Sequence, residues 1–524
     1  MRFKPKLLFI ISLIIALGLF LRLYRYEELF YYAIDEEKAA YITTGIAKLE
    51  HLPTAGYPSS IGFRQGPLFF YLTSFVYRFF DPLPVTVGYL SILASVVSML
   101  LIYAVMKKIN PKTGLIAVFF YAVSYLNVLY ERRGWQLSLD SLLILTVLYS
   151  LLNLIKGKQK FIIPLFLSLA MMTNFEMALL NFLPWTLMAW LFFRINTHRK
   201  FIIIGISLII AANASLLVFD LRHQFLNSRY LLNYFISDSS IRIAPNVPLT
   251  GQREVYLAHN LFPNTLARTL YPAAGHDLAI QYANCPQYLT FKYSRIPKIL
   301  RLFVILLIFY YVYFLFKKRQ IRDLNWQLVF LAVSFILLHF AATSVYTYIF
   351  QGEMAEYYLI PVFAFFFMLV ALAFREMVNR KLSLPVYILM FLFSCANIIP
   401  LVQSENSYGL NKKLAAVDAG LRALGNSSFE LSSFQTCWYS GGYRYLFTYK
   451  GKEPDRSYMD RYLSEYYTPE AGKNVDSELI ILTPELIGEN PAGYEAYRHE
   501  IITTSEHIGT FGAIEVYLID SNDL

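Results

Sequence analysis

Charged residues and cysteines are both scarce in this chain of 524 residues. Lys, Arg, Asp and Glu together make up 16% of it, whereas soluble domains carry about 25%. A water-soluble fold of this length would need far more polar surface, so a soluble globular protein is excluded. The three cysteines, Cys285, Cys395 and Cys437, match no metal-binding spacing. They therefore give no indication of a zinc site.

Acidic residues are too few to balance the basic ones, and the formal net charge is +10. In a soluble protein this excess would first suggest nucleic acid as a partner. Here the cations lie in short clusters between apolar runs, which is where membrane topology places them. The basic start, Met1–Lys6, precedes an apolar run without a small-residue cleavage site behind it. This pattern predicts a retained first helix and not a cleaved signal peptide.

Apolar residues are abundant at 56%, and aromatic residues reach 17%. A helix needs about 20 apolar residues to cross the hydrocarbon of a bilayer. The segment 67–80 is apolar but short, and it contains Pro67 and Arg78, so it predicts a helix in the membrane interface. Eleven runs reach or approach the required length: 7–23, 87–106, 114–130, 137–155, 161–175, 178–193, 201–219, 297–316, 327–349, 357–374 and 382–402.

The basic clusters between these runs predict the orientation. With eleven spans and a cytoplasmic N-terminus, every cluster falls on the cytoplasmic side, which is the positive-inside pattern. A cell inner membrane protein is therefore expected, with outer loops 24–86 and 220–296. The clusters are Lys107-Lys108, Lys156/Lys158/Lys160, Arg194/Arg199/Lys200, Lys317-Lys318-Arg319 and Arg375/Arg380/Lys381.

The last segment, 403–524, has the pattern of a separate soluble domain. It contains strand-like runs at Glu478–Leu482 and Ala513–Leu518 and a helical pattern at Lys412–Leu424. The predicted fold is thus an α-helical polytopic membrane domain, 1–402, with about eleven transmembrane helices and an extracytoplasmic α+β domain after it. A disulfide between Cys285 and Cys437, both expected outside, stays open.

The densest polar cluster at the membrane border lies in the first outer loop. Asp35, Glu36 and Glu37 stand in a row about a dozen residues after the first predicted span. A second motif, Gly62–Leu72, has a Gln65-Gly66-Pro67-Leu68 turn that leads into an aromatic run. Both motifs lie on the side that is predicted to be outside the cytoplasm.

Taken in order, these motifs resemble the GT-C membrane glycosyltransferases. More narrowly, they resemble the branch of protein O-mannosyltransferases and lipid A aminoarabinose transferases, in its bacterial members. The resemblance covers about residues 1–400, and it implies a GT-C-like fold and an inverting mechanism. Many relatives have two prolines in the turn, whereas here the first is Gly66. Further matching motifs are Tyr130–Trp135, Asp140, Phe219–Asn227 and Glu356–Pro361.

Sugar transfer from a polyprenyl phosphate needs a base for the acceptor hydroxyl. The resemblance places Asp35 in that role, with Glu36 assisting through acceptor orientation or metal binding. The two carboxylates would suit a hard divalent cation, whose requirement stays open. Glu37 is expected to be solvated. The alternative is that all three acids only stabilise the N-terminus of a loop helix, at about 0.3–1 kcal/mol each.

Negative charge that grows on the departing phosphate favours cationic side chains. Each group of candidate residues named below also has a purely structural explanation. The arginines would reach to lipid phosphates, Asp220 and Arg222 would form an ion pair at a helix end, and the tyrosines would anchor a helix at the interface. Glu176 is unusual near the end of a span, where ionisable groups are usually functional. The candidates for phosphate binding are Arg132, Arg133, Arg222, His223, Lys38 and Arg64, and those for the acceptor side are Glu353, Glu356, Tyr357 and Tyr358.

The sequence thus predicts a hexosyl or pentosyl transferase that uses a polyprenyl-phosphate donor outside the cytoplasm. The acceptor would be a glycan, lipid or protein hydroxyl, and no nucleic acid is expected as a partner. A transporter or lipid-sugar flippase is the first alternative, and it predicts ionisable residues at the bilayer midplane and paired broken helices. A non-catalytic assembly protein is the second, and it would not need the acids of the first loop.

Overall fold

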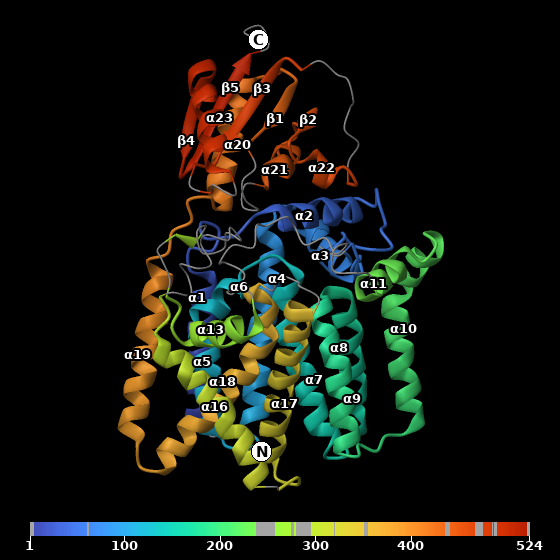
Figure 1. Ribbon diagram of the computed structural model, residues 1–524, viewed down its shortest axis with the longest axis vertical. Helices are drawn as coiled ribbons and strands as arrows, with labels where there is room; N and C mark the ends of the chain where they lie inside the picture. Colours follow the sequence, from blue (N-terminus) through green and yellow to red (C-terminus); the bar gives the residue numbers. More distant parts are fainter. Residues whose placement is uncertain are drawn as a thin grey trace.

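The protein consists of a long helical bundle with a smaller sheet-containing domain at one end (Figure 1). The chain begins at the opposite end of the bundle and finishes on top of the sheet domain. The computed structural model describes residues 5–520 apart from 60–61, 237–256, 274–276, 279–294, 319, 350–354, 435–440, 467–474, 485 and 487–489.

Eight helices in the described ranges are long and apolar enough to cross a membrane, or nine when a bent pair is counted as one span. Shorter apolar helices are α3 (Leu68–Phe79), α8 (Ile162–Phe175) and α9 (Phe182–Phe192). The bent pair is α5 (Pro111–Val123) with α6 (Tyr125–Glu131). The eight are α1 (Pro5–Leu23), α4 (Val85–Met106), α7 (Asp140–Leu154) with the preceding turn, α10 (Arg199–Arg222), α16 (Lys298–Lys317), α17 (Leu324–Ser344), α18 (Ile360–Asn379) and α19 (Ser383–Val402).

Each predicted apolar run coincides with a helix, but two expectations need correction. The fifth and sixth runs form α8 and α9, which are shorter than a full span. The third run is not one straight helix, because α5 and α6 meet at a bend of 64°. Ser124 separates them, and Asn397 of α19 accepts a hydrogen bond from the Tyr125 amide at 2.9 Å. A side chain from a distant helix thus satisfies a backbone group that the bend releases.

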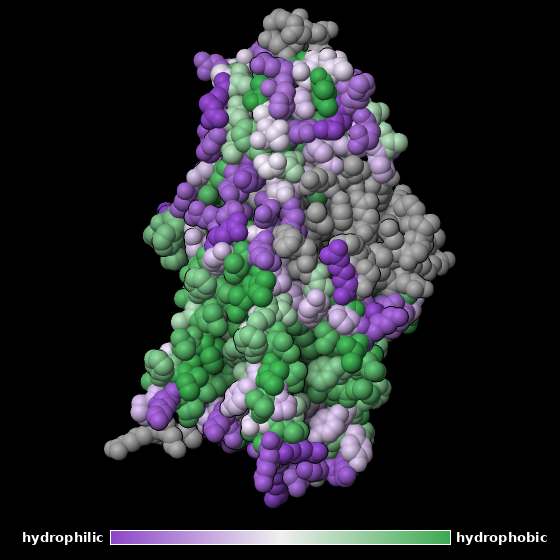
Figure 2. Space-filling view, turned by 90° about the vertical axis from the view of Figure 1, so that its left-hand side faces the viewer, coloured by the Kyte–Doolittle hydropathy of each residue, from purple (hydrophilic) through white to green (hydrophobic). Residues whose placement is uncertain are grey.

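The surface of the bundle is divided as a bilayer would require. Figure 2 shows hydrophobic side chains gathered over the middle of the bundle, between hydrophilic ends. The predicted basic clusters follow α4, α7, α9, α16 and α18, at the end of the bundle far from the sheet domain.

The sheet domain follows α19 and begins with α20 (Leu410–Leu424). Its five strands have the order β2-β1-β3-β5-β4, with β1 parallel to β2 and β3, and β5 antiparallel to β3 and β4. The predicted helix and both predicted strands are confirmed. The elements are β1 (Phe429–Ser432), α21 (Tyr443–Tyr449), β2 (Arg456–Ser457), α22 (Asp460–Leu463), β3 (Ser477–Leu482), α23 (Pro491–Thr504), β4 (Glu506–Phe511) and β5 (Ile514–Asp520).

The sheet is covered on both faces because alternate residues of a strand point in opposite directions. Leu479 of β3 lies next to Gly420 of α20, where a Cβ would come within 2.8 Å of it. Ile480, the next residue, packs in a cluster with Ile501 of α23. The helix α2 (Ile34–Ala47) lies between this domain and the bundle (Figure 1). The three adjacent acids are therefore placed where the two parts of the molecule meet.

Candidate active site

The three acids of the first outer loop form the first turn of α2. Successive residues of an α-helix point about 100° apart, so adjacent side chains must face different surroundings. Asp35 is half-buried, while Glu36 and Glu37 are only 2% and 0% exposed. Their position at a helix N-terminus favours negative charge on all three.

Glu36 points toward the bundle and forms a buried ion pair with Arg133. Its Oε1 accepts hydrogen bonds from Nε and Nη2 of Arg133 at 3.0 and 2.6 Å. The guanidinium of Arg133 also lies 3.9 Å from the ring centroid of Tyr31 and 3.3 Å from that of Trp135. Burial raises the pKa of Glu36, and the charge of Arg133 opposes this rise. The pair fastens the start of α2 to the loop after α6.

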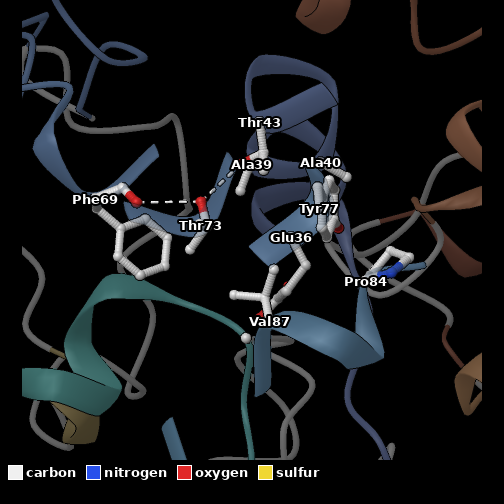
Figure 3. Close-up of a pocket in the computed structure, with 10 residues that line it drawn as sticks. Glu36, Ala39, Ala40, Thr43, Phe69, Thr73, Tyr77, Pro84 and Val87 are labelled. Atoms are coloured by element: carbon white, nitrogen blue, oxygen red, sulfur yellow. Dashed lines mark hydrogen bonds between the residues drawn. The ribbon is translucent and has the colours of Figure 1, made fainter. Parts of the chain in front are cut away.

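A small pocket lies between α2, α3 and the start of α4. Glu36 extends from α2 toward this cavity, as Figure 3 shows. On its far side the hydroxyl of Thr43 lies 3.0 Å from that of Thr73. Asp35 does not line this cavity. It is therefore a space behind the first turn of α2, separate from the surroundings of Asp35.

Glu37 points toward the sheet domain, and the expectation that it is solvated is wrong. Its two carboxylate oxygens accept hydrogen bonds from the backbone amides of Gly442 and Tyr445, at 2.8 and 2.9 Å. Burial raises the pKa of Glu37, and these amides oppose the rise. The charge-assisted bonds explain how a carboxylate can be fully buried here.

Asp35 is half-buried, and several tyrosines lie within the range of its charge. Its charge acts on the hydroxyls of Tyr31, Tyr57, Tyr357 and Tyr466, which come from four separate parts of the chain. Burial raises the pKa of Tyr57 and of Tyr466, and the negative charge of Asp35 adds to the rise in both. These phenols are therefore neutral and able to donate hydrogen bonds. Neutral hydroxyls and aromatic faces around one carboxylate suit a sugar ring.

Lys38 is the predicted cation that shares a side of α2 with Asp35. Residues three apart on a helix are neighbours on its surface. Both side chains approach Tyr57: the Nζ of Lys38 lies 5.8 Å from the ring centroid, and the charge of Asp35 acts on the hydroxyl. A carboxylate and an ammonium group thus share one side of α2, at the end of the bundle near the sheet domain.

A chain of polar contacts extends from Tyr57 to Glu176 at the end of α8. The Gln136 amide donates to the Tyr57 hydroxyl and to Oε1 of Gln65, both at 3.0 Å. The Gln65 amide in turn donates to Glu176 at 3.2 Å. Glu176 is half-buried, and its charge also acts on Tyr57 and Tyr357. A second carboxylate is therefore close to the tyrosines that border Asp35.

Two further predicted cations have partners in other directions. Nη2 of Arg132 donates to the backbone oxygen of Tyr24 at 2.5 Å, and its guanidinium carbon lies 5.8 Å from the ring centroid of Tyr26. Nη2 of Arg64 lies 2.7 and 2.9 Å from the two carboxylate oxygens of Glu465 in the sheet domain. Arg64 also donates to the backbone oxygen of Gly56 at 3.2 Å, and its charge acts on Tyr466, one of the tyrosines on which Asp35 acts.

Arg222 and His223 are exposed at the end of α10. Nδ1 of His223 lies 2.8 Å from the backbone oxygen of Phe219. The carboxylate of Asp220 accepts hydrogen bonds from the amide of Asn227 and the hydroxyl of Ser228, at 2.7 and 2.6 Å. Asp220 thus caps the start of α11 (Leu226–Ile236).

The predicted acceptor side is divided between two surroundings. Glu356 is 3% exposed, forms an ion pair with Arg268 and accepts a hydrogen bond from Tyr130 at 2.7 Å. Tyr357 packs edge-on against Trp135, with ring centroids 5.2 Å apart, and Tyr358 stands beside it at 4.6 Å. The charge of Asp35 acts on Tyr357, while Glu356 is engaged in the bundle. Glu353, Cys285 and Cys437 lie outside the described residues.

Several residues of this region were not singled out from the sequence. The buried Arg268 of α13 (Ala258–Leu270) forms the ion pair with Glu356. The buried Lys413 of α20 binds the backbone of Tyr32, just before α2. Lys413 looks like an ordinary surface lysine because Lys412 precedes it. Tyr57 and Tyr466 are two of 41 tyrosines. Only the fold distinguishes them.

Asp35 and Glu36 were the predicted ligands of a divalent cation. Over the part of the chain that the structure describes, no three His, Cys, Asp or Glu side chains come together. Glu36 is bound by Arg133 and Glu37 by backbone amides, so Asp35 is the one acid of the row without such a partner. A cation held by Asp35 and Glu36 together does not fit this arrangement.

Comparison with known proteins supports the resemblance seen in the motifs. Residues 64–219 match the dolichyl-phosphate-mannose-protein mannosyltransferase family. This stretch begins after Asp35 and includes the Gln65-Gly66-Pro67-Leu68 turn and both arginines after α6. A search of curated proteins finds no match to the chain.

Two solved structures are similar to the chain, and the first matches over its whole length. ArnT from Cupriavidus metallidurans, solved with undecaprenyl phosphate bound, matches over 98% of both chains with a TM-score of 0.55 and 11% identity. The oligosaccharyltransferase of Archaeoglobus fulgidus, in complex with Zn and sulfate, matches 91% of this chain and 68% of its own, with a TM-score of 0.49 and 11% identity. The resemblance is confirmed: this polytopic chain has the fold of the GT-C membrane glycosyltransferases, with a C-terminal α+β domain, and its residues 64–219 match the mannosyltransferase family.

Proposed function

We propose that the protein is a glycosyltransferase that moves a hexose or pentose from a polyprenyl-phosphate donor to an acceptor hydroxyl. The observation that carries this proposal is the placement of Asp35, half-buried among neutral tyrosines, with Lys38 on the same side of α2. The undecaprenyl phosphate bound to ArnT, which shares the fold, supports a lipid phosphate as the donor.

In the proposed reaction Asp35 acts as general base. The acceptor oxygen forms a bond to the anomeric carbon while its proton passes to the carboxylate of Asp35. The bond between the anomeric carbon and the phosphate oxygen breaks, and the phosphate leaves with the bonding electrons. Because attack and departure occur on opposite faces of the sugar, the configuration inverts. Phosphate is a good leaving group, so the step needs no strong acid.

The cations have to balance the charge that grows on the phosphate. Lys38 is the best placed of the predicted candidates, because its ammonium group is on the side of α2 that carries Asp35. Arg133 contributes indirectly by holding Glu36 and thereby the first turn of α2. The tyrosines and Trp135 offer aromatic faces and hydroxyls to the sugar and to the acceptor.

The proposal includes an orientation in the inner membrane. The basic clusters at the end far from the sheet domain place that end and the N-terminus in the cytoplasm. The sheet domain and α2 then lie outside, where a lipid-linked sugar meets its acceptor. The acceptor is a glycan, a lipid or a protein hydroxyl.

The test uses the Asp35→Asn variant, which keeps the size of the side chain and removes the base. Purified protein in proteoliposomes is given radiolabelled polyprenyl-phosphate sugars and membrane extract as the acceptor source. We expect transfer by the native protein and a fall of about 10²–10⁴-fold in the variant, the usual contribution of a positioned base. Undiminished transfer by a folded variant would refute the role of Asp35. Movement of the donor across the bilayer without transfer would favour the flippase.

A further inference from the structure

The sheet domain contacts α2 along one side of that helix. The hydroxyl of Tyr41 lies 3.0 Å from that of Thr448, and the hydroxyl of Thr44 lies 2.8 Å from that of Tyr445. Together with Glu37, these residues are spaced four and three apart, which places them on one face of the helix. This face of α2 therefore faces α21 throughout.

The first turn of α2 packs closely against the segment that leads into α21. A Cβ on Gly441 would come within 3.2 Å of the Cβ of Ile34. Gly442 has a φ of +103°, and a Cβ there would come within 2.9 Å of the ring of Tyr32. The Nζ of Lys413 donates to the backbone oxygens of Tyr32, at 2.8 Å, and of Gly441. Both sides of the contact are thus held by the same ammonium group.

The first turn of α2 is consequently held from two directions. Glu36 binds Arg133 of the bundle, and Glu37 binds the amides of Gly442 and Tyr445. Asp35 directly precedes both in sequence and belongs to the same helical turn. The angle at which its carboxylate meets a substrate depends on both attachments, since a helix turn is rigid.

The sheet domain also reaches the surroundings of Asp35 directly. Tyr466, just beyond α22, is close enough for the charge of Asp35 to act on its hydroxyl. Met459 and Leu463 of the same region pack with Ile34, the first residue of α2. The domain therefore borders the site as well as holding the helix.

We infer that Glu37 is a positioning residue, through which the C-terminal domain sets the orientation of α2 and hence of Asp35. The inference rests on the proposed function, because it assigns to Asp35 the reacting carboxylate. It makes the C-terminal domain a structural part of the catalytic site. Transfer then requires the contact between Glu37 and α21 even though Glu37 touches no substrate.

The first test compares Glu37→Ala with the native protein in the transfer assay and in hydrogen exchange. We expect kcat to fall by about 10²-fold, the usual effect of a displacement near 1 Å, with the KM for the donor unchanged. The amides of Gly442 and Tyr445 should exchange faster. Glu50→Gln is the matched control, because Glu50 follows the same helix with its side chain 65% exposed. An unchanged kcat, or unchanged exchange at both amides, would overturn the inference.

The second test restores the contact without the carboxylate. Ile34→Cys and Gly441→Cys are combined with Glu37→Ala in a background whose native cysteines are replaced by serine. Their Cβ atoms would lie 3.2 Å apart, so a shift of a few tenths of an ångström brings them to the roughly 3.5–4.5 Å of a disulfide. Oxidation should recover most of the lost kcat and reduction should remove it again. A formed disulfide that leaves kcat low would overturn a positioning role.

Glu37→Gln covers the case in which Glu37→Ala is not recovered from the membrane, since it keeps the side-chain size and one acceptor oxygen. It should release one of the two amides and lower kcat by a smaller factor. The two proposals fail differently. Normal transfer by Asp35→Asn removes the base, whereas the exchange of Gly442 and Tyr445 in the Glu37 variants decides the contact independently of any transfer.

Discussion

Gly66 lies directly against Asn174, and a Cβ on Gly66 would come within 1.7 Å of the side-chain oxygen of Asn174. This contact explains why the turn has a glycine at position 66. The Asn174 amide donates to the backbone oxygens of Ala170 and Ala212, at 3.2 and 3.1 Å, so it cannot simply swing away. The glycine and the asparagine are complementary in size.

We expect Gly66→Ala to destabilise the protein by about 1–3 kcal/mol, the usual cost of overpacking. In an Asn174→Ala background the same change should cost much less, because the clashing oxygen is gone. Thermal unfolding of all four proteins in detergent gives the coupling between the two sites. Gly45→Ala is the control, since a Cβ there meets its nearest atom at 3.7 Å. Additive effects at Gly66 and Asn174 would contradict the explanation.

The buried pair of Glu36 and Arg133 predicts a second result. Removing one partner leaves a buried charge, which costs about 3–5 kcal/mol. Glu36→Gln and Arg133→Gln should each lower the unfolding temperature, and the double variant should lose less than the sum. The same thermal measurements check this. If Arg133→Gln instead kept full stability and weakened binding of polyprenyl phosphate, Arg133 would be a phosphate ligand and not an anchor.

Lys38 is expected to bind the donor phosphate. Hydrogen bonds to charged groups are worth about 1.5–3 kcal/mol, so Lys38→Gln should raise the KM for the donor by about tenfold or more. Lys48→Gln is the comparison, because Lys48 ends the same helix and its side chain is 61% exposed. Steady-state kinetics with varied donor concentration measures the difference. Equal KM values for the two variants would remove Lys38 from the phosphate site.

The buried Lys413 predicts a dependence of stability on pH. Burial lowers its pKa from 10.5 to about 7, and the charge of Glu37 only partly opposes this. Between these two values the unfolded chain holds more protons than the folded one, so this lysine favours folding increasingly as the pH rises. The cost of burying its charge is fully present below pH 7.

Lys413→Met should abolish this contribution. The difference in unfolding temperature between native protein and variant should therefore change in favour of the native protein from pH 7 to pH 10. Scanning fluorimetry at several pH values measures it, with Lys412→Met as the control at the neighbouring position. A difference that stays constant over this range would contradict the lowered pKa.

The helices of the bundle were predictable because crossing a bilayer requires about 20 consecutive apolar residues, and such runs are visible directly in the sequence. The bend between α5 and α6 was not, because its cause is Asn397, which stands 272 positions from Tyr125. The apolar run 114–130 alone does not indicate that a distant side chain will bind its backbone. The short helix α8 was predictable, because the apolar run 161–175 ends directly before Glu176, as the helix does.

The candidate site was predictable as a place but not as a set of contacts. Asp35, Glu36 and Glu37 form a row of three acids close to the end of a predicted span. The partner of Glu36 is 97 positions away and a partner of Glu37 is 408 positions away, so local patterns could not assign them. For this reason the sequence suggested phosphate binding for Arg133 and a solvated position for Glu37. The tyrosines on which the charge of Asp35 acts could not be identified, because the chain contains 41 tyrosines.

The bend at Ser124 has a consequence for biosynthesis. The helix tip that carries Arg132 and Arg133 follows α6, and the first amide of α6 is satisfied by Asn397 in the last membrane helix. A ribosome has to complete more than three quarters of the polypeptide before Asn397 exists. The segment with Arg132 and Arg133 therefore reaches its final conformation late in membrane insertion. This happens only after α19 has packed beside the bent pair of α5 and α6.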